Sequence, residues 1–557
     1  MKDGVLVSHA RRVVLLAVPC LLALFGFVLV TVAFAEGGTV DPRQGEEDLR
    51  VTGVSLRGWL GQMTAAGDIN GDGYDDLILG AAGVDYNGRA DAGAVYVMTS
   101  TAALSGAMTA NDALWTIYGA AGGGANHLGD LLGHALAAGD VNNDGYDDLI
   151  IGADGVNHGG QYDVGAVYVF LGHNGSFPVT VTDLRYDVAD ITVLGEFAYG
   201  RLGRSVASGD VNNDGYDDII IGAYRADPGA RDDAGAGYVI LGRATFTRGT
   251  PITFDLTITN ADLTILGDDD GDRLGRSVAS GDVNNDGYGD IIIGAYQADR
   301  TATITNTGKT YVLYGGSSIT WTAPTTVDLS VSSADLTLIG IDKEDQAGFY
   351  VSSGDLNNDG YDDLLITAYQ ADPFGRDEAG EAYVVYGSAG LTGTRYLSVE
   401  ADVTIYGAAA GDRLGRSVTS GDFNGDGYDD LLLGASRADR SATITDTGKA
   451  YLFYGGPTLG ITVDLATTQA DLTVIGEDGC NGACQYTGSS SELTIGDEAG
   501  RSTSAGDLNG DGVADLLIGA LGYDFVSGTE VITDAGIAYG IFGDPASSLS
   551  LIPDSEA

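Results

Sequence analysis

One nine-residue pattern constrains this chain more than any other feature: Asp-x-Asn-x-Asp-Gly-x-x-Asp occurs seven times in 557 residues. The copies begin at Asp68, Asp140, Asp210, Asp282, Asp355, Asp422 and Asp507. Successive copies start 67 to 85 residues apart, and each keeps all four of its polar positions and the glycine. A unit repeated at such a period predicts an array of similar modules rather than a set of unrelated domains.

Short apolar runs surround each copy in the same order. One run follows the pattern, as in 77–81, and others come later in the unit, as in 94–97 and 191–195. A weaker run, as in 203–207, precedes each copy. These runs are rich in β-branched and aromatic residues and are separated by glycine, so they predict strands. Four short strands per unit predict an all-β fold, a seven-bladed β-propeller of four-stranded antiparallel blades.

The register of the repeats predicts how the ring closes. In the third unit the run that starts at Asp190 lies 20 residues before Asp210. Residues 48–53 precede Asp68 in the same register, whereas the last unit stops at 538–543 without such a run of its own. We therefore predict that 48–53 completes the seventh blade and latches the ring, which leaves few open strand edges. The propeller then spans 48–543, with a linker at 36–47 and a tail at 544–557.

The first 35 residues have the features of an export signal. Lys2, Arg11 and Arg12 precede an apolar stretch at 13–35 that ends in a small-x-small cleavage pattern. Because this stretch has 23 residues, an uncleaved N-terminal membrane anchor is the alternative. Both interpretations place the rest of the chain outside the cytoplasm, as a secreted or cell-surface protein.

Composition excludes several classes of partner. Asp and Glu number 79 against 27 Lys and Arg, a formal net charge of −52. Nucleic acids and anionic membrane surfaces require a basic footprint, so neither is expected as a partner. An apolar fraction of 44% rules out a disordered acidic tail.

In an oxidising compartment, Cys480 and Cys484 are candidates for a local disulfide, with two free thiols as the alternative.

The repeated loop has the chemistry of a calcium site. Positions 1, 3 and 5 carry side-chain oxygens, the glycine at position 6 permits a sharp bend, position 7 offers its carbonyl and position 9 a carboxylate. About six oxygens from nine residues suit Ca²⁺, and the absence of His and Cys from the pattern disfavours zinc, copper and iron. Position 12 is apolar in every copy, so an EF-hand is excluded. A metal-free turn is the alternative.

Up to seven Ca²⁺ ions are thus predicted. The predicted ligands are Asp68, Asn70, Asp72, Tyr74, Asp76; Asp140, Asn142, Asp144, Tyr146, Asp148; Asp210, Asn212, Asp214, Tyr216, Asp218; Asp282, Asn284, Asp286, Tyr288, Asp290; Asp355, Asn357, Asp359, Tyr361, Asp363; Asp422, Asn424, Asp426, Tyr428, Asp430; Asp507, Asn509, Asp511, Val513 and Asp515. Position 8 is Asp in five copies but Gly289 and Ala514 in two, so we interpret it as a solvated side chain. The tyrosine ring at position 7 is expected to pack rather than to bind a ligand.

The repeat unit as a whole resembles that of a known family. The unit that runs from Leu202-Gly203 through the loop at 210–218 to Gly237-Tyr238-Val239 is similar to the FG-GAP repeat of integrin alpha subunits. The resemblance implies a seven-bladed propeller with Ca²⁺ in the hairpins of one face, ligand contact through the opposite face, and a role in adhesion or extracellular recognition. The Phe-Gly of the family is Leu-Gly at Leu202, Leu274 and Leu414, and no leg domain or inserted domain is present, so an integrin receptor is not implied.

The face opposite the loops supplies the candidate ligand contacts. Tyr and Arg are favoured at recognition hot spots, although residues encoded by a repeat also recur without a function. The candidates are Tyr224, Arg225, Arg231, Tyr296, Tyr369, Arg376 and Arg437. No catalytic residue is predicted, because catalytic motifs are absent and His127 and His134 are interpreted as loop residues.

The sequence therefore predicts an exported, calcium-binding adhesion or recognition module that is not an enzyme. Its partner would be an extracellular protein or a glycan. A carbohydrate-active propeller, either a lectin or a lyase-like enzyme, and a structural envelope protein are the alternatives.

Overall fold

The computed structural model describes residues 38–45, 47–99, 104–124, 127–175, 180–320, 324–457, 462–477, 496–527 and 530–543. The predicted signal or anchor at 1–35, Cys480, Cys484 and the tail at 544–557 lie outside the described residues. Among the described residues, no helix has the length and apolar character needed to cross a membrane.

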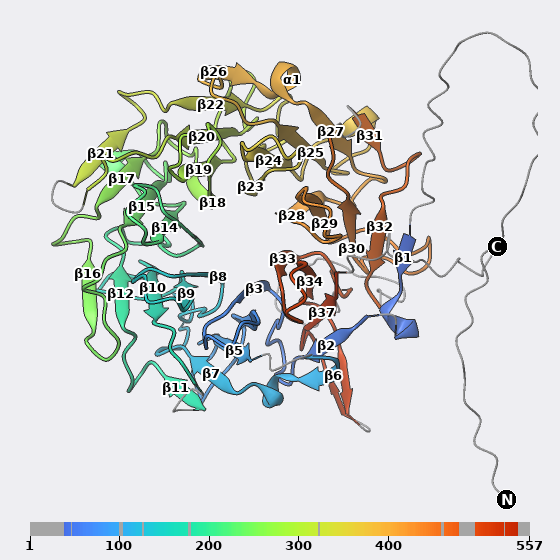
Figure 1. Ribbon diagram of the computed structural model, residues 1–557, viewed down its shortest axis with the longest axis horizontal. Helices are drawn as coiled ribbons and strands as arrows, with labels where there is room; N and C mark the ends of the chain where they lie inside the picture. Colours follow the sequence, from blue (N-terminus) through green and yellow to red (C-terminus); the bar gives the residue numbers. More distant parts are fainter. Residues whose placement is uncertain are drawn as a thin grey trace, which may run out of the picture. The chain divides into compact units, whose positions relative to one another are not determined.

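Residues 38–543 form seven sheets around a common axis, which confirms the predicted propeller (Figure 1). Each blade contains four antiparallel strands, and we number the blades in the chain order of their innermost strands. The innermost strands are β3 (Met63–Gly67), β8 (Ala135–Gly139), β13 (Ser205–Gly209), β18 (Leu274–Gly281), β23 (Val351–Gly354), β28 (Leu414–Gly421) and β33 (Ser502–Gly506). The second strands are β4 (Asp76–Ala81), β9 (Asp148–Ala153), β14 (Asp218–Ala223), β19 (Asp290–Ala295), β24 (Asp363–Ala368), β29 (Asp430–Ala435) and β34 (Asp515–Ala520).

Two further strands complete the antiparallel part of each blade. The third strands are β5 (Ala94–Met98), β10 (Ala166–Phe170), β15 (Ala236–Ile240), β20 (Lys309–Leu313), β25 (Glu381–Val385), β30 (Lys449–Phe453) and β37 (Ile537–Ile541). The fourth strands are β7 (Trp115–Tyr118), β12 (Ile191–Leu194), β17 (Leu263–Leu266), β22 (Leu336–Ile339), β27 (Val403–Tyr406), β32 (Leu472–Ile475) and β2 (Leu49–Thr52).

Each blade also has a fifth, outermost strand, which the sequence did not predict. It runs parallel to the fourth strand and comes from the chain of the following blade, where it precedes that blade's own fourth strand. For blades 1 to 7 these strands are β11 (Val181–Asp183), β16 (Ile252–Asp255), β21 (Thr325–Asp328), β26 (Gly393–Tyr396), β31 (Thr462–Asp464), β1 (Gly38–Val40) and β6 (Gly106–Thr109). Every blade is therefore hydrogen-bonded to a segment of its neighbour.

The N-terminal segment closes the ring twice. β2 pairs antiparallel with β37, with Leu49 opposite Gly540, so the prediction that 48–53 completes the seventh blade is confirmed. β1 pairs parallel with β32, with Gly38 opposite Leu472, and so supplies the fifth strand of blade 6. Residues 38–40 were expected to belong to a linker. They form a strand instead, because β1 precedes β2, the fourth strand of blade 7, as every other fifth strand precedes the fourth strand of the following blade, and blade 6 would otherwise have an open outer edge.

The core consists of seven apolar layers, each between two adjacent blades. In β14, Ile219 and Ile221 pack toward blade 2, whereas Ile220 packs toward blade 4. The second strands are buried on both faces, which explains why they read as continuous apolar runs. Glycine is required where blades touch: a Cβ at Gly80 would lie 2.2 Å from the carbonyl oxygen of Gly133 in the next blade.

The remaining elements are short. They are the hairpin β35 (Phe525–Ser527) and β36 (Glu530–Ile532), the helical turn α1 (Leu397–Glu400), and the 3₁₀ turns Pro42–Gln44, Ala110–Asp112, Pro228–Ala230 and Pro373–Gly375.

Candidate functional site: hairpin loops and the opposite face

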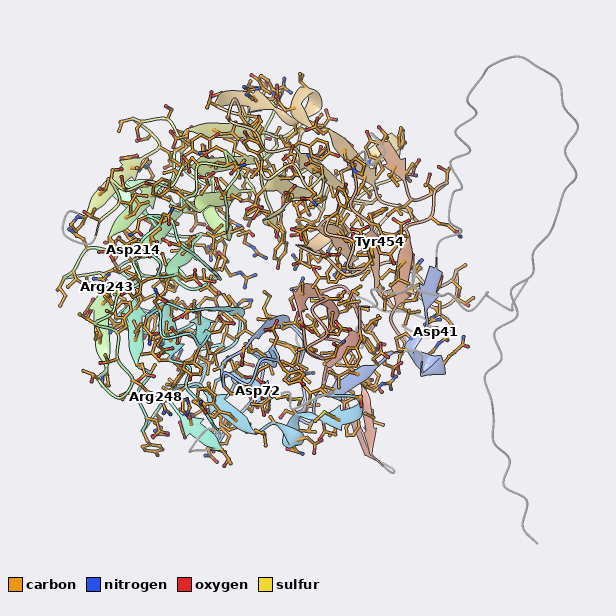
Figure 2. All side chains as sticks on the ribbon, in the orientation of Figure 1. Asp41, Asp72, Asp214, Arg243, Arg248 and Tyr454 are labelled. Atoms are coloured by element: carbon orange, nitrogen blue, oxygen red, sulfur yellow. The ribbon has the colours of Figure 1, made fainter. Side chains whose placement is uncertain are left out.

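The seven Asp loops connect the first and second strands of their blades, so all seven lie at one face of the ring. Asp72 and Asp214, at position 5 of two of the loops, are labelled in Figure 2. The side chain at position 2 fixes each loop to the core, because it is completely buried in every copy. These residues are Ile69, Val141, Val211, Val283, Leu356, Phe423 and Leu508.

Backbone N–H groups organise each loop around the first aspartate. In blade 3 the amides of Asp214 and Gly215 donate to the two oxygens of Asp210 at 3.0 and 2.8 Å. Positions 4 and 6 adopt left-handed backbone conformations, with φ of 52° at Asn213 and 87° at Gly215. Position 6 thus makes the bend that its glycine predicted. Position 4 is Gly or Asn in every copy, and these two residue types tolerate this conformation best.

The aspartate at position 9 is the most buried polar group of each loop. Asp218 is fully buried, and its two oxygens accept hydrogen bonds from Val211 N at 2.9 Å and Gly242 N at 2.8 Å. Burial outweighs these donors and raises the pKa of Asp218 to about 8. The same causes raise the pKa of Asp148 to about 8 and that of Asp363 to about 7. A cation near these carboxylates would favour their charged forms.

The loop chemistry fits calcium. The amide oxygens of Asn284 and Asn357, at position 3 of blades 4 and 5, are buried and accept no hydrogen bond. Each carboxylate oxygen that accepts one N–H retains another lone pair. Across the described residues, however, no three Asp, Glu, His or Cys side chains converge as a preformed metal cluster. The side chains at positions 1, 3, 5 and 9 and the position 7 carbonyl would hold the ion, which would cross-link the loop and neutralise its charge.

Position 8 links neighbouring loops and is not a solvated side chain as predicted. Its backbone N–H donates to the position 1 carbonyl of the preceding blade in all seven copies, including Asp75 N to Asp507 O at 3.0 Å across the ring closure. Where position 8 is Asp, its side chain also accepts the position 1 N–H of that blade, as Asp147 does from Asp68 at 3.0 Å. Gly289 and Ala514 keep only the backbone bond, which explains why the position tolerates them.

The tyrosine ring at position 7 packs as expected. The ring of Tyr146 lies against Gly71 of the preceding loop, and the ring of Tyr74 lies against Gly510. Positions 7 and 8 therefore both contact the loop of the previous blade.

Four arginines predicted to contact a ligand make ion pairs within the protein. Arg231 and Arg376 reach the ends of the fifth strands of their own blades, where they pair with Asp328 at 2.9 Å and Asp464 at 2.8 Å. Arg225 pairs with Asp233 at 3.2 Å, and Arg437 lies 3.8 Å from Glu498. The equivalent pairs in blades 1, 2 and 6 are Arg89–Asp183, His158–Asp255 and Arg440–Asp41. Arg231 and Arg376, like Arg89 and Arg440, therefore help to hold the outer strands, whereas Arg225 and Arg437 pair with carboxylates outside those strands.

Two of the three candidate tyrosines come together beside the axis. Tyr296 and Tyr369 both contact Phe349, with ring centroids 5.1 and 4.1 Å from the phenylalanine ring. Tyr296 also accepts a hydrogen bond from Arg273 Nη1 at 2.7 Å. The third tyrosine, Tyr224, lies under the Arg204 guanidinium at 5.8 Å.

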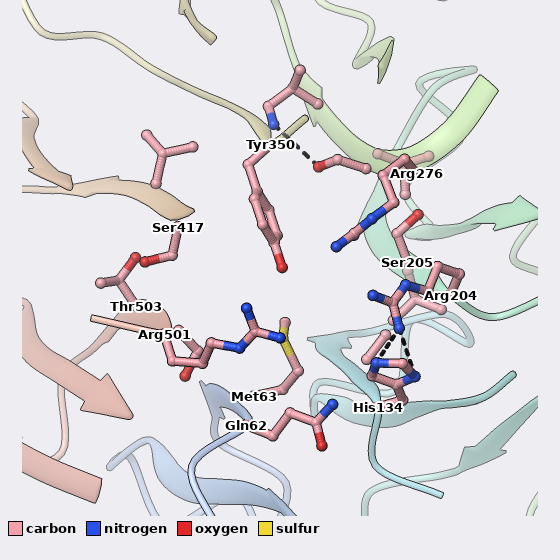
Figure 3. Close-up of a pocket in the computed structure, with 17 residues that line it drawn as sticks. Gln62, Met63, His134, Arg204, Ser205, Arg276, Tyr350, Ser417, Arg501 and Thr503 are labelled. Atoms are coloured by element: carbon pink, nitrogen blue, oxygen red, sulfur yellow. Dashed lines mark hydrogen bonds between the residues drawn. The ribbon is translucent and has the colours of Figure 1, made fainter. Parts of the chain in front are cut away.

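An axial cavity of about 140 Å³ lies at the ends of the innermost strands away from the Asp loops (Figure 3). All seven blades contribute to its lining, and the arginines among these residues are Arg204, Arg276 and Arg501. The position in the repeat that supplies these arginines was not among the site residues predicted from the sequence. The signal was present: the residue after the positive-φ glycine that begins each unit is Arg in four of the seven copies, Arg204, Arg276, Arg416 and Arg501.

His134 also lines this cavity and is not only a loop residue. Its Nδ1 lies 2.7 Å from Asp154, and its ring contacts the Arg204 guanidinium. Burial and the charge of Arg204 lower the pKa of His134 to about 4, so the imidazole is neutral at physiological pH.

Comparison with known proteins agrees with this architecture. The FG-GAP repeat matches seven stretches of the chain, and each match covers the first three strands of one blade. The matched residues are 61–98, 132–170, 202–240, 274–313, 348–385, 414–453 and 499–540. The chain belongs to the FG-GAP repeat family.

Curated relatives are similar over part of their length. The chain is 32% identical to integrin alpha pat-2 of Caenorhabditis briggsae over 260 residues, which cover 44% of this chain and 18% of that protein. It is 30% identical to phosphatidylinositol-glycan-specific phospholipase D of Bos taurus, over 55% of this chain and 35% of that enzyme. A solved rhamnogalacturonan lyase of Bacillus licheniformis aligns over 86% of this chain and 71% of its own, with 14% identity and a TM-score of 0.37. The chain thus spans less than half the length of these curated relatives.

Proposed function

We propose that this protein is an exported, calcium-binding propeller that acts as an extracellular recognition or adhesion module. In this proposal calcium stabilises the face that carries the Asp loops. A protein or glycan ligand binds to the opposite face. The export signal predicted at residues 1–35 supports the extracellular location, and relatedness to integrin alpha chains supports a binding role.

The calcium proposal rests mainly on the seven Asp loops, whose side-chain ligand atoms are all oxygens of Asp and Asn. They occupy equivalent positions in every blade, and backbone donors hold the first aspartate in place in each copy. The buried, unpartnered oxygens of Asn284 and Asn357 add acceptors that a cation would satisfy. Carboxylates held this close repel one another without a counterion, so binding of Ca²⁺ to the folded form would stabilise it by mass action.

Calorimetric titration tests the metal proposal directly. The protein is dialysed against a chelator and titrated with CaCl₂, and we expect saturable binding at up to seven sites together with a higher melting temperature. Asp214→Asn should weaken the site of blade 3 alone, because the Asp214 side chain accepts hydrogen bonds only from Asn212 and Tyr216 of its own loop. Asp232→Asn removes an exposed carboxylate from the same blade and serves as the matched control. Identical melting with calcium and with chelator would contradict the proposal.

The residues on the face opposite the Asp loops favour a binding role over a catalytic one. Its centre presents arginines, an aromatic cluster and hydroxyl groups, which are residue types typical of recognition surfaces. A screen of glycans and extracellular proteins, run with calcium and with chelator, tests this part. Ligands should bind the calcium-loaded form, and binding should fall after substitution of the arginines at the centre of the face opposite the Asp loops. Turnover of a bound glycan would instead favour a carbohydrate-active enzyme.

A further inference from the structure

The axial cavity carries an excess of positive charge in a protein that is otherwise strongly acidic. Asp and Glu outnumber Lys and Arg by 79 to 27 in the chain, yet the cavity is lined by three arginines and by no Asp or Glu among the described residues. Figure 3 shows the guanidinium groups of Arg204, Arg276 and Arg501 directed toward the same space as the Tyr350 hydroxyl. These side chains come from four different blades, so only ring closure brings them together.

Arg276 and Arg501 lack the ion pairs that arginines elsewhere in the protein make, and Arg204 has only a long one, with Asp154 at 3.7 Å. Arg276 is only 5% exposed, and its guanidinium lies 4.3 Å from the Phe349 ring and 5.2 Å from the Tyr350 ring. Among the described residues, no carboxylate lies within 4 Å of Arg276, Arg416 or Arg501. A buried cation without a counterion is costly, and such a group is normally paired.

Unused hydrogen-bond donors point to a ligand as well. Arg204 Nε is buried and has no acceptor, and the same holds for Nη1 of Arg416, which does not itself line the cavity. Ser205 and Ser502 also line the cavity, but their hydroxyl donors are already used in hydrogen bonds between blades. Ser205 Oγ donates to Gly275 O at 3.0 Å, and Ser502 Oγ donates to Gly61 O at 3.0 Å. The arginines are therefore the main free donors of the cavity.

The titration behaviour of the cavity residues reflects the same uncompensated charge. Burial and the charge of Arg276 lower the pKa of Arg204 to about 10. Burial alone would raise the pKa of Tyr350, but the charges of Arg276, Arg416 and Arg204 outweigh it and lower this pKa to about 8. His134 is neutral and adds no charge. Asp154 compensates only the Arg204 side of the cavity, through Arg201 at 3.3 Å and Arg204 at 3.7 Å.

We propose that the axial cavity binds an oxyanion group, held by Arg204, Arg276 and Arg501 with the Tyr350 hydroxyl as an additional donor. Guanidinium groups match carboxylate, sulfate and phosphate geometry and bind them with charge-assisted hydrogen bonds. A volume of about 140 Å³ corresponds to about five waters at roughly 30 Å³ each, which is enough for the acidic group of a ligand. This inference rests on the proposed recognition role of the same face and specifies the chemistry of its ligand.

Calorimetry on the full chain tests the inference. The protein, with saturating calcium, is titrated at constant ionic strength with sodium sulfate, sodium phosphate, sodium glucuronate and, as an uncharged control, glucose. We expect saturable binding of one or more oxyanions and none of glucose. Arg276→Gln and Arg501→Gln should each weaken binding at least about tenfold. The exposed Arg185→Gln serves as the matched control and should leave binding unchanged. Preference for glucuronate over the inorganic ions would identify an acidic sugar as the source of the group.

A spectroscopic readout keeps the test valid if an arginine variant fails to fold. Tyrosinate absorbance should reveal one tyrosine that titrates near pH 8, which Tyr350→Phe removes. A bound oxyanion neutralises the arginines and should shift this titration upward. No saturable binding by the folded protein, or equal binding by Arg276→Gln, would overturn the inference. Calcium is titrated into the same samples, so a calcium response without oxyanion binding would reject this inference and leave the calcium proposal intact.

Discussion

At the scale of single residues, blade 5 differs from its neighbours at one charged position. The third strand begins with Lys309 in blade 4 and Lys449 in blade 6, but with Glu381 in blade 5. Burial and then the charge of Glu381 raise the pKa of Asp345 to about 7. The pKa of Asp412, which is buried near Lys449, rises only to about 6, whereas that of Asp272, which lies near Lys309 but also near Asp268 and Asp269, rises to about 7. Blade 5 therefore places two carboxyl groups where blade 6 has an acid and a base.

The Asp345–Glu381 contact predicts a pH-dependent stability. Because the folded-state pKa of Asp345 is raised, the native state holds more protons than the unfolded state between about pH 4 and about pH 7, and stability falls as pH rises through this window. Glu381→Gln keeps an acceptor for the Tyr383 hydroxyl, which bonds to Glu381, and removes the like charge. We expect about 1.4 kcal/mol of added stability above this window for each unit by which the pKa of Asp345 falls.

Urea unfolding at about pH 5 and about pH 8 measures this gain, which should be larger at the higher pH. Asp377→Asn, which removes an exposed acid of the same blade, is the control. Parallel pH profiles for the wild type and Glu381→Gln would show that the two carboxyl groups are not coupled.

At the scale of elements, the parallel fifth strands explain how single blades become one ring. Each is short and is supplied by the next blade. In four blades an arginine pairs with an aspartate at the end of this strand, and in blade 2 His158 Nε2 lies 3.0 Å from Asp255. In blade 4 the cation instead stacks on an aromatic ring, with Arg300 4.5 Å from Tyr396. At the N-terminal latch the aspartate is Asp41, labelled in Figure 2, which accepts bonds from Arg440 at 2.7 and 3.0 Å.

Asp41→Asn should weaken the latch. Burial would raise the pKa of Asp41, but hydrogen bonds from Arg43 and Arg440 hold it well below its usual range. The pair therefore contributes stability above about pH 4 that is lost as pH falls. Breaking a largely buried ion pair costs on the order of 3 kcal/mol. We expect lower stability and faster proteolysis near residues 38–52.

Asp464→Asn breaks the equivalent pair of blade 5, where the fifth strand is internal to the chain, and provides the comparison. It should cost similar stability without exposing the N-terminal segment. Equal protease resistance of Asp41→Asn and the wild type would show that β1 and β2 hold the ring closed without this ion pair.

At the scale of the whole molecule, a net charge of −52 favours expansion through self-repulsion. Screening by salt should reduce this cost. We expect the melting temperature of the calcium-free protein to rise gradually as NaCl increases toward about 1 M, where the Debye length is about 3 Å. Calcium should act at far lower concentration, because it binds specific loops instead of screening the whole surface.

Thermal melts in NaCl, MgCl₂ and CaCl₂ at matched ionic strength separate the two effects. Magnesium should follow NaCl, since it demands octahedral geometry and dehydrates reluctantly. Equal responses to the three salts would show that screening alone stabilises the ring.

The sequence was informative about each unit and less so about contacts between units. Strands such as β14 and loops such as 210–218 were predictable because their pattern is local: an apolar run, or oxygens spaced around a glycine. The role of position 8 was not, because Asp147 bonds to Asp68 of another blade, 79 residues away. The candidate tyrosines Tyr296 and Tyr369 lie on the face opposite the Asp loops as predicted, but their shared contact with Phe349 depends on the interface between blades 4 and 5.

The repeats alone thus determined the number of blades, the face that carries the Asp loops and the strand that completes blade 7. Periodicity and residue type carry that information within a single unit. Only the tertiary structure decided which segments supply the fifth strands, which side chains bridge adjacent loops, and that Arg204, Arg276 and Arg501 meet at one axis. These features depend on distances across the closed ring, and a linear pattern does not encode those distances until the blades have packed.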